Sequence, residues 1–129
     1  MREIKFRGKS IGGREWAYGG YFKNSEENGM VHYIFDGGNK GAVSILSETV
    51  GEYTGIKDRN GKEIYEGDVV CTSLLIPGEV KWGDDIACFE VVHSLGSRGL
   101  FGYIKEGPGV LVIGNVHENP DLLKCTTHS

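Results

Sequence analysis

The stretch Tyr53–Val70, YTGIKDRNGKEIYEGDVV, contains two turn signals around a short run that favours a β-strand. Asn60-Gly61 is a strong hairpin signal, because a type I′ turn needs positive φ at both of its central residues. Gly67-Asp68 directly precedes Val69-Val70, and an Asp in such a step commonly accepts backbone N–H groups within a turn. We therefore predict that Asn60, Gly61, Gly67 and Asp68 are structural turn residues that lead into a C-terminal β section.

The chain on either side of this stretch is punctuated by glycine, which accounts for 21 of the 129 residues. The glycines show no collagen-like period, so they indicate turns and bulges between short strands. From Val69 onward the chain contains five short apolar segments separated by turn residues. Their spacing is typical of a small antiparallel barrel. They are Val69–Thr72, Glu79–Trp82, Ile86–Val92, Leu100–Lys105 and Val110–Val116.

The two ends of the chain carry their own signals. Glu3–Arg7 alternates apolar and charged residues, so we expect Ile4 and Phe6 to face a core and Lys5 and Arg7 to face solvent. Near the other end, Asn119-Pro120 can begin a helix, with Asn as the cap and Pro at the first helical position. Only a short C-terminal helical turn is predicted.

These patterns predict a mostly β protein in two sections. Residues 1–50 would form an N-terminal β section and residues 51–129 a C-terminal small β-barrel, packed as separate domains or as one compact unit. The Glu66–Val70 turn and strand, followed by Gly78-Glu79-Val80, has a strand-turn-strand rhythm that suggests an SH3-like barrel by analogy. Such an analogy concerns architecture and does not determine function.

Several blocks of the chain occur together in a distinctive order. They are Met1–Gly8, Trp16–Gly19, Glu48–Gly55, Asn60–Val70, Gly78–Trp82 and Gly114–Pro120. This series resembles the YopX family of phage and prophage proteins, from Met1 to about Leu123. The resemblance implies a mostly β fold from mobile phage regions, with no established enzyme activity, cofactor or catalytic residue to carry over.

The residues themselves favour no catalytic or metal-dependent chemistry. Asp58–Glu63 has a passing likeness to a calcium loop, but its sixth position is Glu63 instead of the glycine of that motif. The four histidines are dispersed and the three cysteines form no CxxC pair, so no zinc pattern is present. We expect no enzyme activity, no cofactor and no metal.

A nucleic-acid-binding function is the main alternative that the residues suggest. Lys5, Arg7 and Lys9 share one face of the predicted first strand, and Trp16 and Tyr18 could stack on bases beside them. Basic residues on a terminal strand also protect its edge from pairing, and aromatics at period two often form cross-strand pairs. The net charge of −4 makes general affinity for phosphate groups unexpected.

We therefore expect a non-catalytic phage or prophage accessory protein that acts through protein–protein contact. Its partners would be further copies of itself, as a homo-oligomer, and an unidentified phage or host protein. Neither a secretory signal nor a membrane-spanning apolar run is evident in the sequence, so the expected location is the host bacterial cytoplasm.

Overall fold

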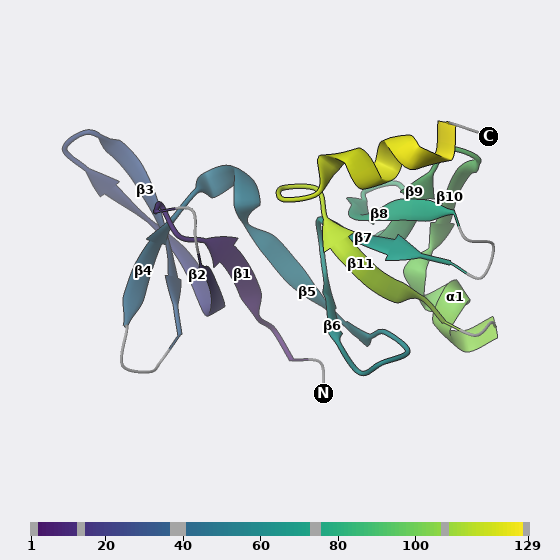
Figure 1. Ribbon diagram of the computed structural model, residues 1–129. Helices are drawn as coiled ribbons and strands as arrows, with labels where there is room; N and C mark the ends of the chain where they lie inside the picture. Colours follow the sequence, from purple (N-terminus) through teal and green to yellow (C-terminus); the bar gives the residue numbers. More distant parts are fainter. Residues whose placement is uncertain (1–2, 13–14, 37–40, 73–75, 107–108, 128–129) are drawn as a thin grey trace. The chain divides into compact units, whose positions relative to one another are not determined.

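The computed structural model describes residues 3–12, 15–36, 41–72, 76–106 and 109–127. These residues form a mostly β chain with the following elements: β1 (Phe6–Lys9), β2 (Trp16–Glu26), β3 (Gly29–Phe35), β4 (Ala42–Ile45), the 3₁₀ helix η1 (Ser47–Thr49), β5 (Gly51–Lys57), β6 (Glu63–Tyr65), β7 (Asp68–Cys71), β8 (Pro77–Gly83), β9 (Cys88–His93), β10 (Gly96–Gly99), α1 (Leu100–Glu106), β11 (Leu111–Asn115) and the 3₁₀ helix η2 (Pro120–Thr127) (Figure 1).

The chain divides into two compact units, which we call unit 1 (Met1–Tyr53) and unit 2 (Thr54–Ser129). A six-stranded sheet has the order β4-β3-β2-β1-β5-β6, and a five-stranded sheet in unit 2 has the order β10-β9-β8-β7-β11. The prediction of a mostly β protein is confirmed. Neither sheet closes into a barrel within the described residues, so the observed architecture is a pair of open sheets.

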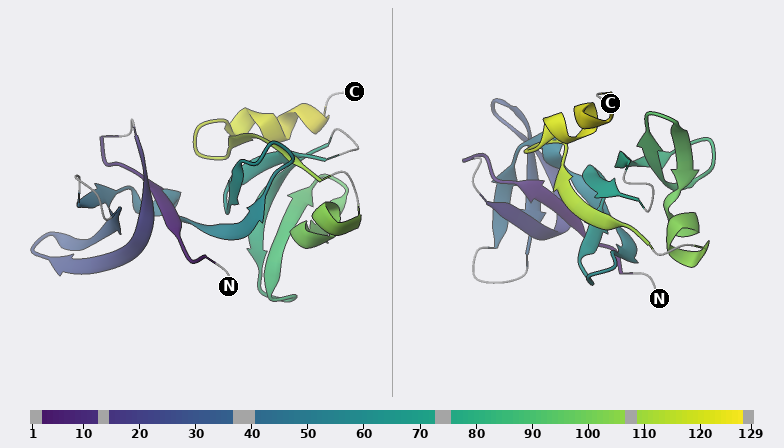
Figure 2. Two further views of the ribbon diagram at one scale, coloured as in Figure 1. Left: turned by 90° about the horizontal axis from the view of Figure 1, so that it is seen from below. Right: turned by 45° about the vertical axis from the view of Figure 1, so that its right-hand side comes forward.

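In unit 1, β2 changes its pairing partner halfway along its length. Its first half pairs with β1, up to Gly19, and its second half pairs with β3 from Gly20 onward. Gly19 has a φ of 151°, and a Cβ atom there would collide with the carbonyl oxygen of Phe35. The bend at this point therefore depends on a residue without a side chain. Beyond it, β2 pairs with β3, and β3 in turn pairs with β4 over His32–Phe35 (Figure 2).

The core of unit 1 lies on the inner face of this bent sheet. Ile34 and Ile45 are buried there, and the ring of Phe6 lies 5.7 Å from that of Tyr21. A bridge joins Ser10 to Ile45, so β4 approaches the end of β1 as well as β3. The apolar residues at alternating positions account for this packing.

The expected orientation of the first strand is wrong for Ile4 and Arg7, whereas Phe6 faces the core as expected. Ile4 precedes β1 and is 71% exposed, whereas Arg7 is only 6% exposed. Because β1 pairs with β2 on one side and β5 on the other, it is an interior strand and has no edge to protect. The Arg7 guanidinium lies 4.6 Å from the centre of the Trp16 ring. The ring stabilises the guanidinium charge by a cation–π contact, although the alternating pattern predicted that Arg7 faces solvent.

The Asn60-Gly61 turn lies between β5 and β6, but its geometry differs from a type I′ turn. Gly61 has a φ of 83°, whereas Asn60 does not have positive φ. The Gly61 N–H donates to the Asp58 carbonyl at 3.0 Å, and the Asp58 N–H donates to the Lys62 carbonyl at 2.8 Å. This is the three-residue loop in which a type I turn is followed by a glycine in the left-handed region.

The second turn consists of Glu66 and Gly67, and Asp68 already belongs to β7. Asp68 is buried, and its Oδ2 accepts the Tyr65 N–H at 2.8 Å. The Gly67 N–H donates to the Val80 carbonyl at 2.8 Å, and the Gly67 carbonyl accepts the Val116 N–H at 2.9 Å. Gly67 and Asp68 thus fix the point where β6, β8 and the end of β11 meet.

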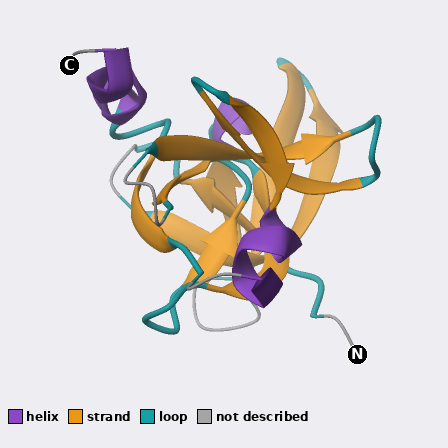
Figure 3. Ribbon diagram, turned by 90° about the vertical axis from the view of Figure 1, so that its right-hand side faces the viewer, coloured by secondary structure: helices purple, strands orange, loops and turns teal. Residues whose placement is uncertain are grey.

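Unit 2 has an apolar core between its strands and α1 (Figure 3). The core residues are Ile64, Val70, Val80, Phe89, Val91, Leu100 and Val110. The prediction of a strand over Leu100–Lys105 is wrong, because this segment is α1. Leu100 is buried and Tyr103 packs against the same core, and side chains three residues apart share a face of a helix but not of a strand.

The C-terminal helical segment is η2, a 3₁₀ helix that contacts β8. The Asn119 side chain before it turns back along the chain, where its Oδ1 accepts the Asn115 N–H at 3.2 Å. The Asn115 Oδ1 in turn accepts the N–H groups of His117 and Glu118. These asparagines hold together the turn between β11 and η2.

Candidate functional site

The strand register of unit 1 brings most of the proposed nucleic-acid contacts together. In the β1–β2 pair, Arg7 lies opposite Tyr18 and Lys9 lies opposite Trp16. Directly opposed residues of antiparallel strands share a face, so these four side chains belong to one face of the sheet. The next residue of the alternating series, Lys5, precedes β1.

The basic groups of this set are engaged within unit 1. The Lys5 ammonium lies 3.4 Å from the Glu3 carboxylate and 5.3 Å from the centre of the Tyr53 ring. Arg7 is buried against Trp16, and Lys9 is half-buried. A cation held in this way offers less of its charge to a phosphate group than an exposed one does.

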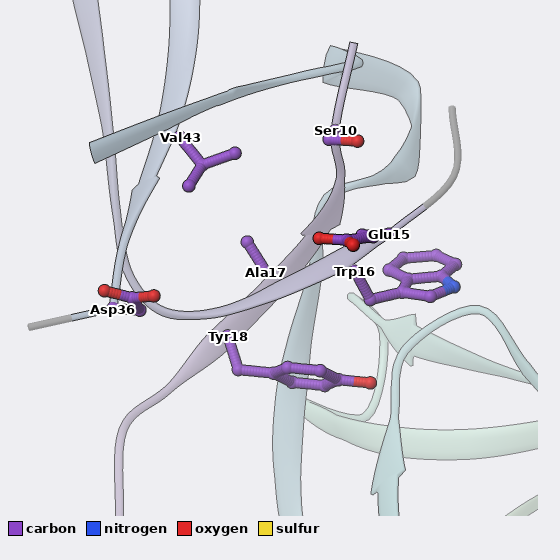
Figure 4. A pocket seen from close by; sticks show the side chains of 7 residues that line it. All are labelled: Ser10, Glu15, Trp16, Ala17, Tyr18, Asp36 and Val43. Carbon is purple, nitrogen blue, oxygen red and sulfur yellow. The ribbon is translucent and has the colours of Figure 1, made fainter. Parts of the chain in front are cut away.

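A pocket of about 370 Å³ lies beside this part of β2 (Figure 4). Its lining residues are Ser10, Glu15, Trp16, Ala17, Tyr18, Asp36 and Val43. Ala17 and Val43 point toward one another across the opening, whereas the rings of Trp16 and Tyr18 project on the other side of β2. The charged groups among the described lining residues are the carboxylates of Glu15 and Asp36, which disfavours an anionic ligand here.

The most exposed aromatic surface of unit 1 lies on the outer face of β2 and β3. Phe22 and Tyr33 are directly opposed, and their rings stack with centres 5.1 Å apart. Phe35, opposite Gly20, is 52% exposed, Phe22 is 43% exposed and Tyr18 is 46% exposed. We call Tyr18, Phe22, Tyr33 and Phe35 the outer aromatic face.

Sequence reasoning found only Tyr18 of this group. Tyr33 and Phe35 stand two positions apart in the sequence, and Phe22 stands four positions after Tyr18. The strand register was needed to place Phe22 against Tyr33. The hydroxyl of Tyr33 also donates to the Glu26 carboxylate, and this hydrogen bond raises the pKa of Tyr33. The carboxylate marks the rim of the face.

The opposite face of the same strands has a structural role. The Tyr21 hydroxyl and the His32 Nδ1 are 2.6 Å apart, and the two rings are stacked with centres 5.8 Å apart. Both side chains are half-buried next to the inner core. This pair is explained by packing, and its histidine needs no ligand.

Asp58 is the most heavily hydrogen-bonded carboxylate in the β5–β6 loop. Its Oδ1 accepts the N–H groups of Asn60 and Lys62 at 2.8 and 2.9 Å. Its Oδ2 accepts the Val112 N–H at 3.0 Å. Burial tends to raise the pKa of the Asp58 carboxyl, but these donors and the nearby Lys62 charge lower it more, so that the pKa lies below its usual value.

The described residues contain no group of three or more histidine, cysteine or acidic side chains able to hold a metal ion. Cys71 and Cys88 are free thiols, and neither the side chain of Cys125 nor His128 is among the side chains described. No helix in the described part of the chain has the length and apolar character needed to cross a membrane.

The chain belongs to the YopX family. A family model described as YopX protein matches residues 5–124, which includes almost every element of both units. The sequence resemblance stated above is thereby confirmed.

A solved structure similar to this chain is the crystal structure of protein EF1440 from Enterococcus faecalis. The two chains share 24% sequence identity with a TM-score of 0.61, and the match covers 95% of this chain and 99% of the other. At this identity the similarity establishes the fold. A comparison with curated proteins found no match.

Proposed function

We propose that this YopX-family protein is a non-catalytic accessory protein, encoded by a phage or prophage, that acts through protein–protein contact in the host bacterial cytoplasm. The observation that supports the contact is the outer aromatic face, on which Tyr18, Phe22 and Phe35 are each more than two fifths exposed. Aromatic side chains are enriched in protein interfaces, and contiguous exposed apolar patches commonly mark them. No cofactor or enzyme activity is proposed.

Self-association is the form of contact that this face fits best. Arg7 of β1 lies opposite Tyr18 on this face but is only 6% exposed. The residues that share the face in β2, β3 and β4, between Tyr18 and the rim at Glu26, carry no formal charge. They are Tyr18, Gly20, Phe22, Asn24, Val31, Tyr33, Phe35, Ala42 and Ser44. Two copies can therefore bring the same patch together without repulsion between like charges, as a two-fold symmetric dimer requires.

Sedimentation velocity over a range of protein concentrations tests this proposal. We expect a concentration-dependent dimer for the wild type, and a monomer for the F22S/F35S double variant. Met30→Ser is the matched control, because Met30 is 55% exposed on the same hairpin but on the opposite face. A wild type that stays monomeric, or a double variant that dimerises normally, would contradict the proposed contact.

The alternative function is a small nucleic-acid-binding β module. Its support is the common face of Arg7, Lys9, Trp16 and Tyr18, although the adjoining pocket contributes two carboxylates. Titration of labelled single-stranded and duplex DNA at two salt concentrations separates the two functions. Binding that weakens steeply with salt and is lost in the K5Q/K9Q variant would favour the alternative.

We also propose that the five-stranded sheet of unit 2 is an open relative of an SH3-like barrel. Its described pairings are antiparallel, and the last strand, β11, returns to lie beside the first, β7. This order supports the analogy with small barrels but adds nothing about the activity.

A further inference from the structure

The second half of β2 has an open strand edge in unit 1. From Gly20 to Glu26, β2 pairs with β3 on one side, whereas its pairing with β1 on the other side ends at Gly19. The chain before β1 follows β5 instead, since the Lys5 carbonyl accepts the Tyr53 N–H at 2.8 Å. The end of the β2–β3 pair thus projects past β1 (Figure 1).

Hydrogen bonds at the ends of the neighbouring strands show which backbone groups lie on this edge. Next to β1, the Ser10 N–H donates to the Glu15 carbonyl at 2.9 Å. Next to β4, the Asp36 N–H donates to the Gly41 carbonyl at 3.3 Å. Residues along an antiparallel strand direct their N–H and C=O groups alternately to its two sides. The odd-numbered residues of β2 therefore direct these groups toward the side of β1, and the even-numbered residues direct theirs toward β3.

Three residues of the projecting end have backbone donors and acceptors on the open edge. They are Tyr21, Lys23 and Ser25, and these groups form no hydrogen bond within the described part of the chain. The register with β3 is continuous from Gly20 to Glu26, so no bulge disrupts the edge. A row of unpaired N–H and C=O groups is a template for pairing with another strand.

Other strand edges are covered by the chain's own backbone. At the outer edge of β4, the Ile11 N–H donates to the Ser44 carbonyl at 3.1 Å. Beside β11, the Arg59 N–H donates to the Val110 carbonyl at 3.0 Å. Because the same chain covers these two edges and leaves the edge of β2 open, the groups on β2 fit a strand that another molecule supplies.

Lys23 sets the charge of the strand that fits this edge. It is exposed, lies opposite His32 on β3, and forms no ion pair with an acidic side chain in the described ranges. If two copies paired their whole open edges about a two-fold axis, Lys23 would lie directly opposite Lys23 of the other copy. Like charges in that position are destabilising, whereas an acidic residue there is stabilising. The lysine therefore selects against a second copy and in favour of an acidic strand.

We propose that the open edge of β2 accepts an extended segment of a partner protein as an added antiparallel strand, with an acidic residue opposite Lys23. The backbone of the segment pairs with Tyr21, Lys23 and Ser25, and the acidic side chain selects the register. This inference does not rest on the proposed self-association, because that contact uses the outer face of the strands and leaves their edge free.

NMR amide shifts and hydrogen exchange of the full chain test this assignment. The probe is acetyl-Thr-Val-Thr-Glu-Thr-Val-Thr-amide. One comparison peptide has lysine in place of glutamate, and the other has N-methyl groups on the glutamate and both valines. We expect the probe to shift the amides of Tyr21, Lys23 and Ser25 and to slow their exchange. The lysine peptide should bind about fivefold more weakly, and the N-methylated peptide, which lacks the pairing donors, should not bind.

Variants of the edge separate strand addition from nonspecific attraction. Lys23→Glu should reverse the preference, so that the lysine peptide binds about fivefold more tightly than the probe. Ser25→Pro should abolish binding of every peptide, because proline removes a donor on the open side and is tolerated at a strand edge. The F22S/F35S variant should bind the probe normally, whether or not the wild type dimerises.

Several results would contradict strand addition at β2. Equal binding of the probe and the N-methylated peptide, an unchanged preference in Lys23→Glu, or shifts centred outside β2 would overturn the proposal. So would protection of the Tyr21, Lys23 and Ser25 amides that rises with protein concentration in the absence of peptide, because the occupant would then be a second copy.

Discussion

Single residues of unit 2 connect segments that lie far apart in the sequence. Asp58 accepts hydrogen bonds from its own loop and from Val112, 54 positions away. Its buried carboxylate is thus paired with three backbone donors, and loss of that acceptor would leave the donors unsatisfied. The residue that the sequence presented as the first position of a poor calcium loop is therefore a structural acceptor.

Asp58→Asn should lower the free energy of unfolding by about 2–3 kcal/mol at pH 7. The amide of asparagine would place a donor where Oδ2 accepts the Val112 N–H. Urea denaturation of both proteins measures the difference, and Asp84→Asn, in an exposed turn, is the control. An Asp58→Asn variant as stable as the Asp84→Asn control would show that these hydrogen bonds make no net contribution to the free energy of unfolding.

The same substitution has a predictable pH dependence. Because folding lowers the pKa of Asp58, its ionised form stabilises the protein fully above the pKa of the unfolded chain, which is about 3.9. That stabilisation is lost as the pH falls toward the folded pKa. The difference in unfolding free energy between wild type and Asp58→Asn should stay constant from pH 7 to about pH 5 and shrink below about pH 4. A difference that grows on acidification would contradict this.

Gly19 and its neighbour Gly20 offer a matched pair of substitutions. An alanine at Gly19 would meet the Phe35 carbonyl and a φ of 151°, whereas one at Gly20 would enter open space. We expect Gly19→Ala to cost about 2–4 kcal/mol and Gly20→Ala less than about 0.5 kcal/mol. Denaturation at low protein concentration measures both. Similar losses for the two variants would mean that the bend of β2 does not require glycine.

At the scale of the elements, the glycine turns and the apolar segments between them predicted strands that correspond to β7, β8, β9 and β11. Two features depended on longer-range contacts. The interior position of β1 follows from its pairing with β5, which residues 1–9 do not encode by themselves. The helical form of α1 follows from burial of Leu100 and Tyr103 against the core, since the segment Leu100–Lys105 has apolar residues at both strand and helix spacing.

The helical assignment of α1 can be tested by alanine substitution. In a helix, Leu100 and Tyr103 share the core-facing side, and Phe101 is 61% exposed. In a strand, Phe101 and Tyr103 would share a face. We expect Leu100→Ala and Tyr103→Ala to lower the unfolding free energy by about 2–4 kcal/mol and Phe101→Ala by less than about 1 kcal/mol. Equal effects of Phe101→Ala and Tyr103→Ala would favour a strand.

At the scale of the whole molecule, the two units have separate apolar cores. The buried residues of unit 1 include Ile34 and Ile45, and those of unit 2 include Val80 and Val91. The outer aromatic face, which we propose for self-association, lies wholly in unit 1.

Separate cores predict that the two units lose stability separately. Val80→Ala should destabilise unit 2 by about 2 kcal/mol, and hydrogen exchange should then accelerate in β7, β8 and β9. The amides of β3 around Ile34 should keep their protection, because their core contains none of the affected side chains. Ile34→Val is the reciprocal control, and it should accelerate exchange in unit 1 alone. If either substitution accelerates exchange equally in both units, the chain unfolds as a single cooperative unit. The strand β5 would explain such coupling, because it begins in unit 1 and ends in unit 2.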